Sequence, residues 1–207
     1  MTRIGKERKE EIRYSIINEA KILFFTNGYD KTSTSEIAKA VGIAEGTIFN
    51  YFKTKAEIFL AVFTDEFLKE TIEIDCFVDL NSGVLDIIFD FLNKNFKFLY
   101  MLPKGMLRDL GVAFLNIAKK SPKIVSKFAA LDYKMMDFLC ELIKDLQQKK
   151  LIIDCDARAL TETIYSVVTF EFLIYIYEDV KTKEEMLRNL RQKIEIIIKG
   201  YVFEINK

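Results

Sequence analysis

The sequence predicts an all-α protein, and three observations support that fold class. Of the 207 residues only two are proline and eight are glycine, whereas Ile, Leu, Phe, Lys and Glu dominate. Apolar residues recur at intervals of three and four along most of the chain, as on one face of an α-helix. Alternation with a period of two, which marks a half-buried strand, is hard to find. We therefore expect about nine helices.

The first helix is expected from about Lys6 to Asn27. Gly28 follows it and can adopt the left-handed conformation that commonly ends a helix. One apolar stripe runs along this segment and consists of Ile12, Ile16, Ala20, Leu23 and Phe24.

Two short helices follow and are separated by a tight turn. The capping box Ser33-Thr34-Ser35-Glu36 opens one of them, which ends at Gly42. The other spans about Glu45 to Phe52. Gly42 permits a positive φ, and Ile43 can pack into the angle between the helices. This arrangement is typical of a helix-turn-helix.

Six longer helices complete the expected fold. A second capping box, Thr54-Lys55-Ala56-Glu57, opens the first of them, which reaches about Ile74. Ser121-Pro122 is a good helix start, and residues 149–156 form a connector. The other five helices are expected near 83–101, 104–119, 122–149, 157–178 and 182–203.

The composition excludes several classes of function. The chain has no histidine, so a histidine-based catalytic triad, proton shuttle or zinc site is ruled out. Cys76, Cys140 and Cys155 lie too far apart for a CxxC pair or a zinc ribbon. They are interpreted as buried reduced thiols, with an oxidation sensor as the alternative. We expect no catalytic residue, no metal and no cofactor.

The sequence is expected to belong to a cytoplasmic protein. Its first ten residues are charged and lack the apolar core of a signal peptide. No run reaches the ~18 apolar residues of a membrane span, and the longest candidate, Ile164 to Tyr177, is interrupted by Glu171. Residues 1–55 carry ten Lys and Arg against seven Asp and Glu, whereas residues 56–207 carry 21 against 24. The basic excess therefore lies in the segment that holds the helix-turn-helix.

Residues 32–59, TSTSEIAKAVGIAEGTIFNYFKTKAEIF, resemble the DNA-binding signature of the TetR family of bacterial repressors. The match includes Ile37-Ala38, Gly42-Ile43, the run from Gly46 to Phe52, and Lys53-Thr54-Lys55. It covers about a quarter of the chain, together with the helix before it. The remaining three quarters match the family only in the number and length of the expected helices.

The resemblance implies that the third helix enters the major groove of operator DNA and that the fourth connects it to a ligand domain. The residue types agree, because Thr47, Asn50 and Tyr51 offer hydrogen-bonding groups and Gly46 allows close approach of the backbone. Lys55 begins the fourth helix, where its charge and the helix dipole both favour phosphate. The expected DNA-binding residues are Thr34, Ser35, Glu45, Gly46, Thr47, Phe49, Asn50, Tyr51 and Lys55.

Three residues depart from the family pattern. Phe49 stands where tyrosine is common, so that only apolar contact, for example with a thymine methyl group, remains. Glu45 is acidic where a polar or basic residue is frequent, and either accepts a hydrogen bond from a cytosine amino group or faces solvent. Ala44 cannot cap the third helix as a serine would.

The sequence divides into residues 1–55, a helix-turn-helix DNA-binding domain, and residues 56–207, a helical ligand-binding and dimerisation domain. The resemblance implies that the last two helices form a four-helix interface in a homodimer, and a single large core is the alternative. The apolar run from Ile164 to Tyr177 and the isoleucine-rich segment 194–202 permit the homodimer.

A small apolar or amphipathic effector is expected among the middle helices, which are rich in Phe, Met and Leu. Glu171 would meet a cationic ligand, reach solvent or pair at the interface. The expected pocket residues are Phe89, Phe96, Leu99, Tyr100, Met106, Phe114, Phe128, Met135, Phe138 and Glu171.

The sequence thus indicates a ligand-responsive transcriptional regulator, in the first place a repressor, that binds a near-palindromic operator as a dimer and leaves it when the effector binds. A DNA-bound adaptor without a small ligand is the first alternative. An enzyme or lipid carrier with an incidental helical pair is the second, and the lack of a nucleophile constellation argues against it.

Overall fold

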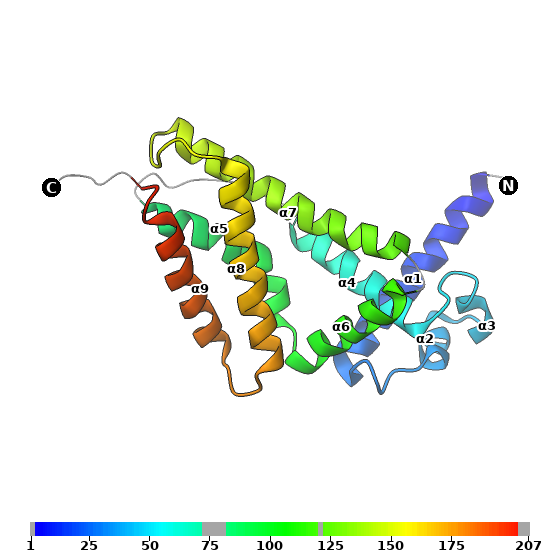
Figure 1. Cartoon of the computed structure of the whole chain (residues 1–207). Helices are drawn as coiled ribbons and strands as arrows, with labels where there is room; N and C mark the ends of the chain where they lie inside the picture. Colours follow the sequence, from blue (N-terminus) through cyan, green and yellow to red (C-terminus); the bar gives the residue numbers. More distant parts are fainter. Residues whose placement is uncertain (1–2, 72–81, 120–121, 203–207) are drawn as a thin grey trace. The chain divides into compact units, whose positions relative to one another are not determined.

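The computed structural model describes residues 3–71, 82–119 and 122–202, and every regular element within these ranges is a helix (Figure 1). This confirms the predicted fold class. The nine helices of the described residues are α1 (Arg3–Asn27), α2 (Thr34–Val41), α3 (Glu45–Ile48), α4 (Lys55–Thr71), α5 (Val84–Met101), α6 (Lys104–Ala118), α7 (Pro122–Gln148), α8 (Ala157–Tyr177) and α9 (Lys183–Ile198).

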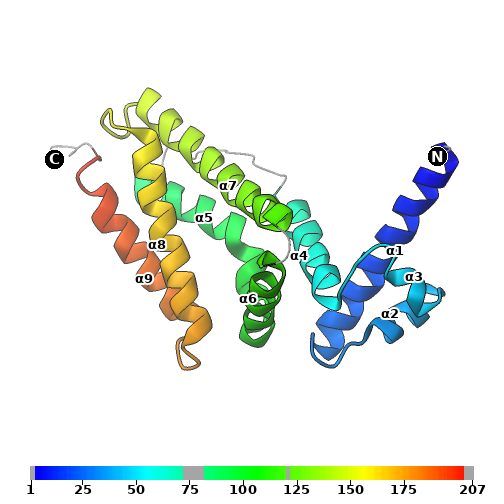
Figure 2. The same ribbon diagram turned by 45° about the vertical axis from the view of Figure 1, so that its right-hand side comes forward.

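The helices form two compact units. One holds α1 to α4 and nearly all of α6, and the other holds α5, most of α7, α8 and α9. In the first unit α1 packs against α4 and α2, and α2 packs against α3. In the second, α9 packs against both α8 and α5, and α8 and α9 lie side by side in Figures 1 and 2.

The core of the first unit forms where the stripe of α1 meets α4. Ile16, Ala20 and Phe24 are fully buried, as the apolar periodicity predicts. The Phe24 ring meets Phe59 of α4 edge-on at 5.0 Å between centroids. Because aromatic pairs add specific geometry to apolar burial, this contact fixes α4 against α1 as well as excluding water.

The second unit is held by apolar residues from all four of its helices. Ile88 of α5, Leu139 of α7, Ile164 of α8 and Ile194 of α9 have no exposed surface. Arg191 of α9 also donates to Asp86 of α5 at 2.5 Å.

Two helix ends differ from the predictions. The third helix was expected to reach Phe52, but α3 ends at Ile48 and the chain continues as a tight turn. The N–H groups of Asn50 and Tyr51 donate to the carbonyls three residues earlier, which is the tighter pattern common at helix ends. The last helix was expected to reach residue 203, but α9 ends at Ile198 because the chain then turns and Val202 forms an isolated antiparallel bridge with Ile152.

Of the remaining predictions, Cys76, Ser121 and the end of the fourth expected helix beyond residue 71 lie outside the described residues. Cys140 is buried, Cys155 is half-buried, and both are free thiols. Burial and the nearby charges of Asp156 and Asp154 raise the pKa of the Cys155 thiol. Since the thiolate is the reactive form, this shift disfavours the oxidation-sensor alternative at Cys155.

Candidate nucleic-acid interface

The turn between α2 and α3 is built by local hydrogen bonds that the sequence predicts. The Ser33 hydroxyl accepts from the Glu36 N–H at 3.1 Å, and the Glu36 carboxylate accepts from the Ser33 N–H at 2.8 Å. The latter bond and one from the Ser33 hydroxyl lower the pKa of Glu36. At the other end, Gly42 adopts φ +77° and the Ile43 N–H donates to the Ala38 carbonyl at 3.0 Å. This combination closes α2 and redirects the chain into α3.

The segment from α3 to residue 52 has one face inside the unit and one face in solvent. Ile48 and Phe52 are buried in the core, whereas Asn50 is exposed and Phe49 is 42% exposed. Gly46 is exposed too, and a Cβ built on it would meet nothing within 4 Å. The unit's own packing therefore does not require glycine at this position, and a partner from outside can approach the backbone closely.

Thr34 and Glu45, both expected to contact DNA, are bonded to each other. The Thr34 hydroxyl donates to the Glu45 carboxylate at 2.6 Å, which joins the first turns of α2 and α3. The carboxylate thus lies near two helix N-termini, where the partial positive charge of the backbone N–H groups stabilises an anion. This pairing accounts for the acidic residue without a cytosine contact.

The Lys55 ammonium is directed toward the end of α1. It donates to the Tyr29 carbonyl at 2.9 Å and lies 4.3 Å from the centroid of the Tyr29 ring. Burial and the charges of Asp30 and Asp109 raise the pKa of the Tyr29 hydroxyl. Lys55 therefore ties the start of α4 to the turn that precedes α2, a role that its position in the sequence does not reveal.

The other expected DNA-binding residues keep their hydrogen-bonding groups available. Ser35 is exposed at the start of α2, and Thr47 and Tyr51 are half-buried beside the exposed Asn50. None of these four side chains makes a hydrogen bond within the described part of the chain. Gly46, Thr47, Phe49, Asn50 and Tyr51 belong to α3 and the turn that follows it, and Ser35 belongs to the start of α2.

The ten expected pocket residues do not fall in one unit. Met106 and Phe114 belong to the first unit, and the other eight belong to the second. Among the latter, Tyr100 is buried and its hydroxyl has no hydrogen-bond partner in the part of the chain that the structure describes. Burial raises the pKa of this hydroxyl, so it is a neutral donor at physiological pH.

Glu171 is buried, with 3% of its surface exposed, and is paired with two lysines. Lys181, in the connection between α8 and α9, donates to its carboxylate at 2.8 Å, and Lys193 of α9 also donates to it. Burial alone would raise the pKa of Glu171, but the hydrogen bonds and charges of the two lysines lower it below its usual value. The expectation for Glu171 was a cationic ligand, solvent, or a pair at the interface, whereas the two lysines that bind its carboxylate belong to the same unit.

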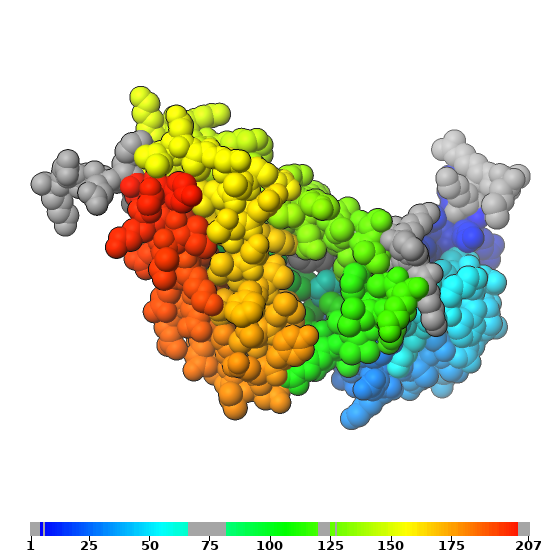
Figure 3. Space-filling model, viewed as in Figure 1, coloured from blue at the N-terminus to red at the C-terminus, as the bar shows by residue number. Residues whose placement is uncertain are grey.

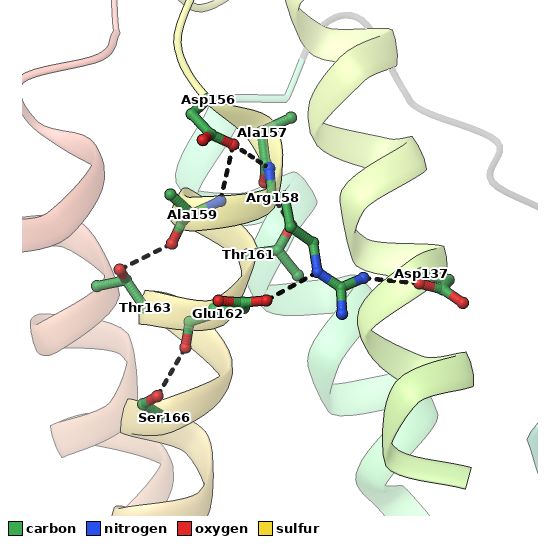
Figure 4. A network of polar contacts seen from close by, with 9 residues as sticks. All are labelled: Asp137, Asp156, Ala157, Arg158, Ala159, Thr161, Glu162, Thr163 and Ser166. Atoms are coloured by element: carbon green, nitrogen blue, oxygen red, sulfur yellow. Dashed lines mark hydrogen bonds and ion pairs between the residues drawn. The ribbon is translucent and has the colours of Figure 1, made fainter. Parts of the chain in front are cut away.

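A pocket in the second unit is lined by none of the expected pocket residues. It has a volume of about 510 Å³ and is lined by Cys140, Lys144, Gln147 and Cys155, among others. At its edge Arg158 of α8 bridges Asp137 of α7, at 2.7 Å, and Glu162, at 2.9 Å (Figure 4). Both ion pairs are exposed to solvent. The pair with Asp137 joins α8 to α7, and neither pair indicates a particular ligand.

The exposed α3 surface and the open backbone at Gly46 define the class of protein: a helix-turn-helix protein that binds DNA. Comparison with known proteins agrees. Residues 16–62 match the family model described as bacterial regulatory proteins, tetR family.

The relatives of known sequence are transcriptional regulators. Over 59 residues the chain is 41% identical to AcrR of Shigella flexneri, an alignment that covers 28% of this chain and 27% of AcrR. It is 26% identical over 181 residues to QacR of Staphylococcus aureus, with 82% of this chain and 91% of QacR covered. The match to AcrR thus spans about a quarter of either protein, whereas the match to QacR spans most of both.

Solved structures show the same fold. A TetR-family regulator from Mesorhizobium loti aligns with a TM-score of 0.70 at 17% identity and covers 98% of this chain and all of that one. The regulator FadR from Bacillus subtilis, solved in complex with stearoyl-CoA, aligns with a TM-score of 0.63 at 20% identity, covering 90% and 98%. Residues 16–62 thus form a DNA-binding domain of the TetR family, and the chain is a DNA-binding transcriptional regulator of the helix-turn-helix type.

Proposed function

We propose that this protein is a ligand-responsive repressor that binds a near-palindromic operator as a homodimer in the cytoplasm. Residues 1–55 bind the DNA, and residues 56–207 form the dimer and receive a small apolar or amphipathic effector. The observation that carries the proposal is the exposed surface of α3 and the turn after it, where Gly46, Phe49 and Asn50 face solvent.

Dimerisation is supported by an apolar surface on α8 and α9. Within α8, Phe170 is 55% exposed, Leu173 is 43% exposed and Tyr177 is 72% exposed, and Ile196 of α9 is 75% exposed. Phe170, Leu173 and Tyr177 recur at intervals of three and four and therefore share one side of α8. The two helices pack against each other and lie side by side in Figure 3, so that these exposed apolar residues belong to neighbouring helices. Large exposed apolar residues on neighbouring helices are typical of an interaction site, and a second copy of this chain is the partner that we propose.

Among the described residues, α8 is the one helix that is long and apolar enough to cross a membrane. A role as an interface helix explains this apolar composition. The Glu171 carboxylate, in the second half of α8, is hydrogen-bonded to two lysines, and a lipid environment would penalise these charges heavily. An interface helix that is apolar on both its core side and its partner side needs no membrane.

Two copies also strengthen DNA binding. A module with few phosphate contacts binds weakly at physiological salt, and a dimer doubles those contacts. Its recognition helices would lie about 34–36 Å apart, or a multiple of that, to reach successive major grooves.

Effector binding is supported by the buried Tyr100 hydroxyl, which has no hydrogen-bond partner among the described residues, and by the fold shared with FadR, whose structure contains stearoyl-CoA. An effector that binds the DNA-free conformation more tightly shifts the equilibrium toward it, by a coupling of about 1–3 kcal/mol in typical cases. The alternative, an adaptor without a small ligand, differs from this proposal only in lacking that coupling.

The first experiment tests DNA recognition. A random duplex library is selected on the purified protein, and binding of the enriched duplex is measured for Asn50→Ala and for the control Lys39→Ala on the exposed surface of α2. We expect an inverted repeat and a loss of about 1–3 kcal/mol for Asn50→Ala alone. Failure of the wild-type protein to bind any duplex at low salt would refute the proposal.

A second experiment tests the dimer. Light scattering is measured for Leu173→Asp on the α8 surface and for the control Leu115→Asp on α6, which is also an exposed leucine. Only Leu173→Asp should yield monomers, and it should weaken operator binding. A wild-type protein that is monomeric at micromolar concentration contradicts the dimer but not the DNA-binding domain.

A further inference from the structure

Two basic residues of α1 lie beside the aromatic residues that follow α3. The Lys9 ammonium is 6.0 Å from the centroid of the Tyr51 ring, and the Arg13 guanidinium carbon is 5.1 Å from the centroid of the Phe52 ring. Both contacts lie within the first unit. They bring the amino-terminal part of α1 next to the end of the α3 segment, and Figures 1 and 2 show this part of α1 extending past α2 and α3.

The acidic residues of this part of α1 lie on other sides of the helix. At 100° per residue, Lys9 and Arg13 are about 40° apart and continue the line of the buried Ile16 and Ala20. Glu7 and Glu11 are each about 140–180° from the mean direction of the two basic residues, and Glu10 is about 80° from it. The side of α1 that faces α3 therefore carries positive charge without an acidic neighbour on the same stripe.

The two basic residues are held differently. Arg13 is half-buried and lies against the buried Phe52 ring, so that it has a packing role. Lys9 is exposed, and 6.0 Å is the outer limit of a cation–π contact, so that its ammonium can turn away from Tyr51 at little cost. Of the two, Lys9 is the residue whose charge is available to a partner.

We propose that Lys9, which lies beside Tyr51, binds a phosphate of the operator and thereby extends the DNA-binding surface from α3 onto α1. The proposal rests on the proposed function. The surface is continuous with the exposed groups of α3, and a single ammonium on a flexible stem suits a phosphate oxygen, which carries no sequence information. Lys9 thereby adds affinity and fixes the position of α1 along the DNA backbone, while base recognition stays with α3.

The test measures salt dependence in the full-length protein. Binding to a labelled duplex of mixed sequence is followed by fluorescence anisotropy at several salt concentrations for wild type, Lys9→Gln and Arg8→Gln. Arg8 is the matched control, because it is the exposed neighbouring cation and projects about 100° away from Lys9 around the helix. Both variants lose one positive charge, and thermal unfolding verifies that both are folded.

We expect Lys9→Gln to reduce the slope of log K against log salt concentration by about 0.9 for each copy of Lys9 in the complex, hence by about 2 in a dimer. Between about 50 and 200 mM salt, the affinity of wild type should then fall about tenfold more than that of Lys9→Gln. Lys9→Arg should retain the wild-type slope, and Arg8→Gln should stay close to it.

An equal slope for wild type and Lys9→Gln would overturn this inference while leaving DNA binding intact. Equal reductions for Lys9→Gln and Arg8→Gln would also overturn it, since the effect would then come from net charge. Absence of wild-type binding to duplex DNA at low salt would overturn both this inference and the proposed function.

Discussion

Replacing Glu171 with glutamine should destabilise the protein strongly, because it leaves the ammonium of a buried lysine without its counter-charge. The Lys181 side chain is 10% exposed and its only ion pair among the described residues is with Glu171. The Lys193 side chain is 42% exposed, so that water already screens its interaction with Glu171. Removal of one partner from a buried ion pair costs about 3–5 kcal/mol.

We take the lower end, about 3 kcal/mol, because Lys193 can turn to solvent. For a protein of this length such a loss lowers the melting temperature by about 6–12 °C. Lys193→Met, which removes the exposed partner, should cost about 1 kcal/mol or less. The double variant Glu171→Leu with Lys181→Met should recover most of the loss, since apolar residues of similar volume often replace a buried pair without cost. Thermal and urea unfolding at one fixed protein concentration measure all four proteins.

The pH dependence gives an independent check. Because the folded-state pKa of Glu171 lies below the usual value of 4.5, the carboxylate stabilises the fold fully above that value. The contribution is lost as the pH falls through the lowered folded-state pKa. The difference in stability between wild type and Glu171→Gln should therefore narrow in acid. Equal costs for Glu171→Gln and Lys193→Met at neutral pH would refute the reasoning, because they would show that Lys181 is not held out of water.

Three further substitutions test the first unit and the expected effector site. Glu45→Gln should raise the affinity for duplex DNA by up to about fivefold in anisotropy measurements, since it removes an exposed negative charge worth about 1 kcal/mol or less beside the phosphates; a loss of affinity would indicate a direct contact of Glu45 with a base. Lys55→Met should lower stability by about 1–2 kcal/mol, because the bonds to Tyr29 are lost; unchanged unfolding with a reduced salt slope would show that Lys55 binds phosphate instead. Tyr100→Phe should be neutral or stabilising by up to about 1 kcal/mol, since no bond within the described residues is lost; it should weaken effector binding in calorimetry if the hydroxyl meets the effector.

Local sequence signals were sufficient to predict the helix-turn-helix. The capping box at Ser33 and the left-handed Gly42 involve residues at most five apart in sequence, so that the residue types alone specify the bonds. The same is true of Gly28, which adopts φ +89° after the last turn of α1. The end of α3 could not be predicted in this way. It depends on Phe52 entering the core of the unit, a constraint that comes from packing rather than from the sequence around Asn50.

The charged clusters around Glu171 and Lys55 could be identified only from the tertiary structure. Glu171 meets one lysine ten residues later, in a connection, and another 22 residues later, on α9. Neither lysine lies on the same helix as Glu171, so the helical periodicity of the sequence does not reveal these two ion pairs. Lys55 and Tyr29 are 26 residues apart for the same reason. Lys9 is an exception, since its position on the extended apolar stripe of α1 is visible in the sequence once α1 and α3 are known to be adjacent.

The hydrogen bonds already formed inside the first unit restrict how this protein can recognise DNA. Thr34 and Glu45 satisfy each other, and Lys55 is bonded to backbone carbonyls. We therefore propose that base recognition depends chiefly on Asn50, together with the apolar edge of Phe49, because the exposed Asn50 side chain can both donate to and accept from a base edge. A recognition surface with so few specific groups gives modest discrimination for each half-site. In the proposed dimer a twofold axis would serve specificity as much as affinity, and loss of the proposed α8–α9 interface should reduce the preference for the operator over random DNA as well as the strength of binding.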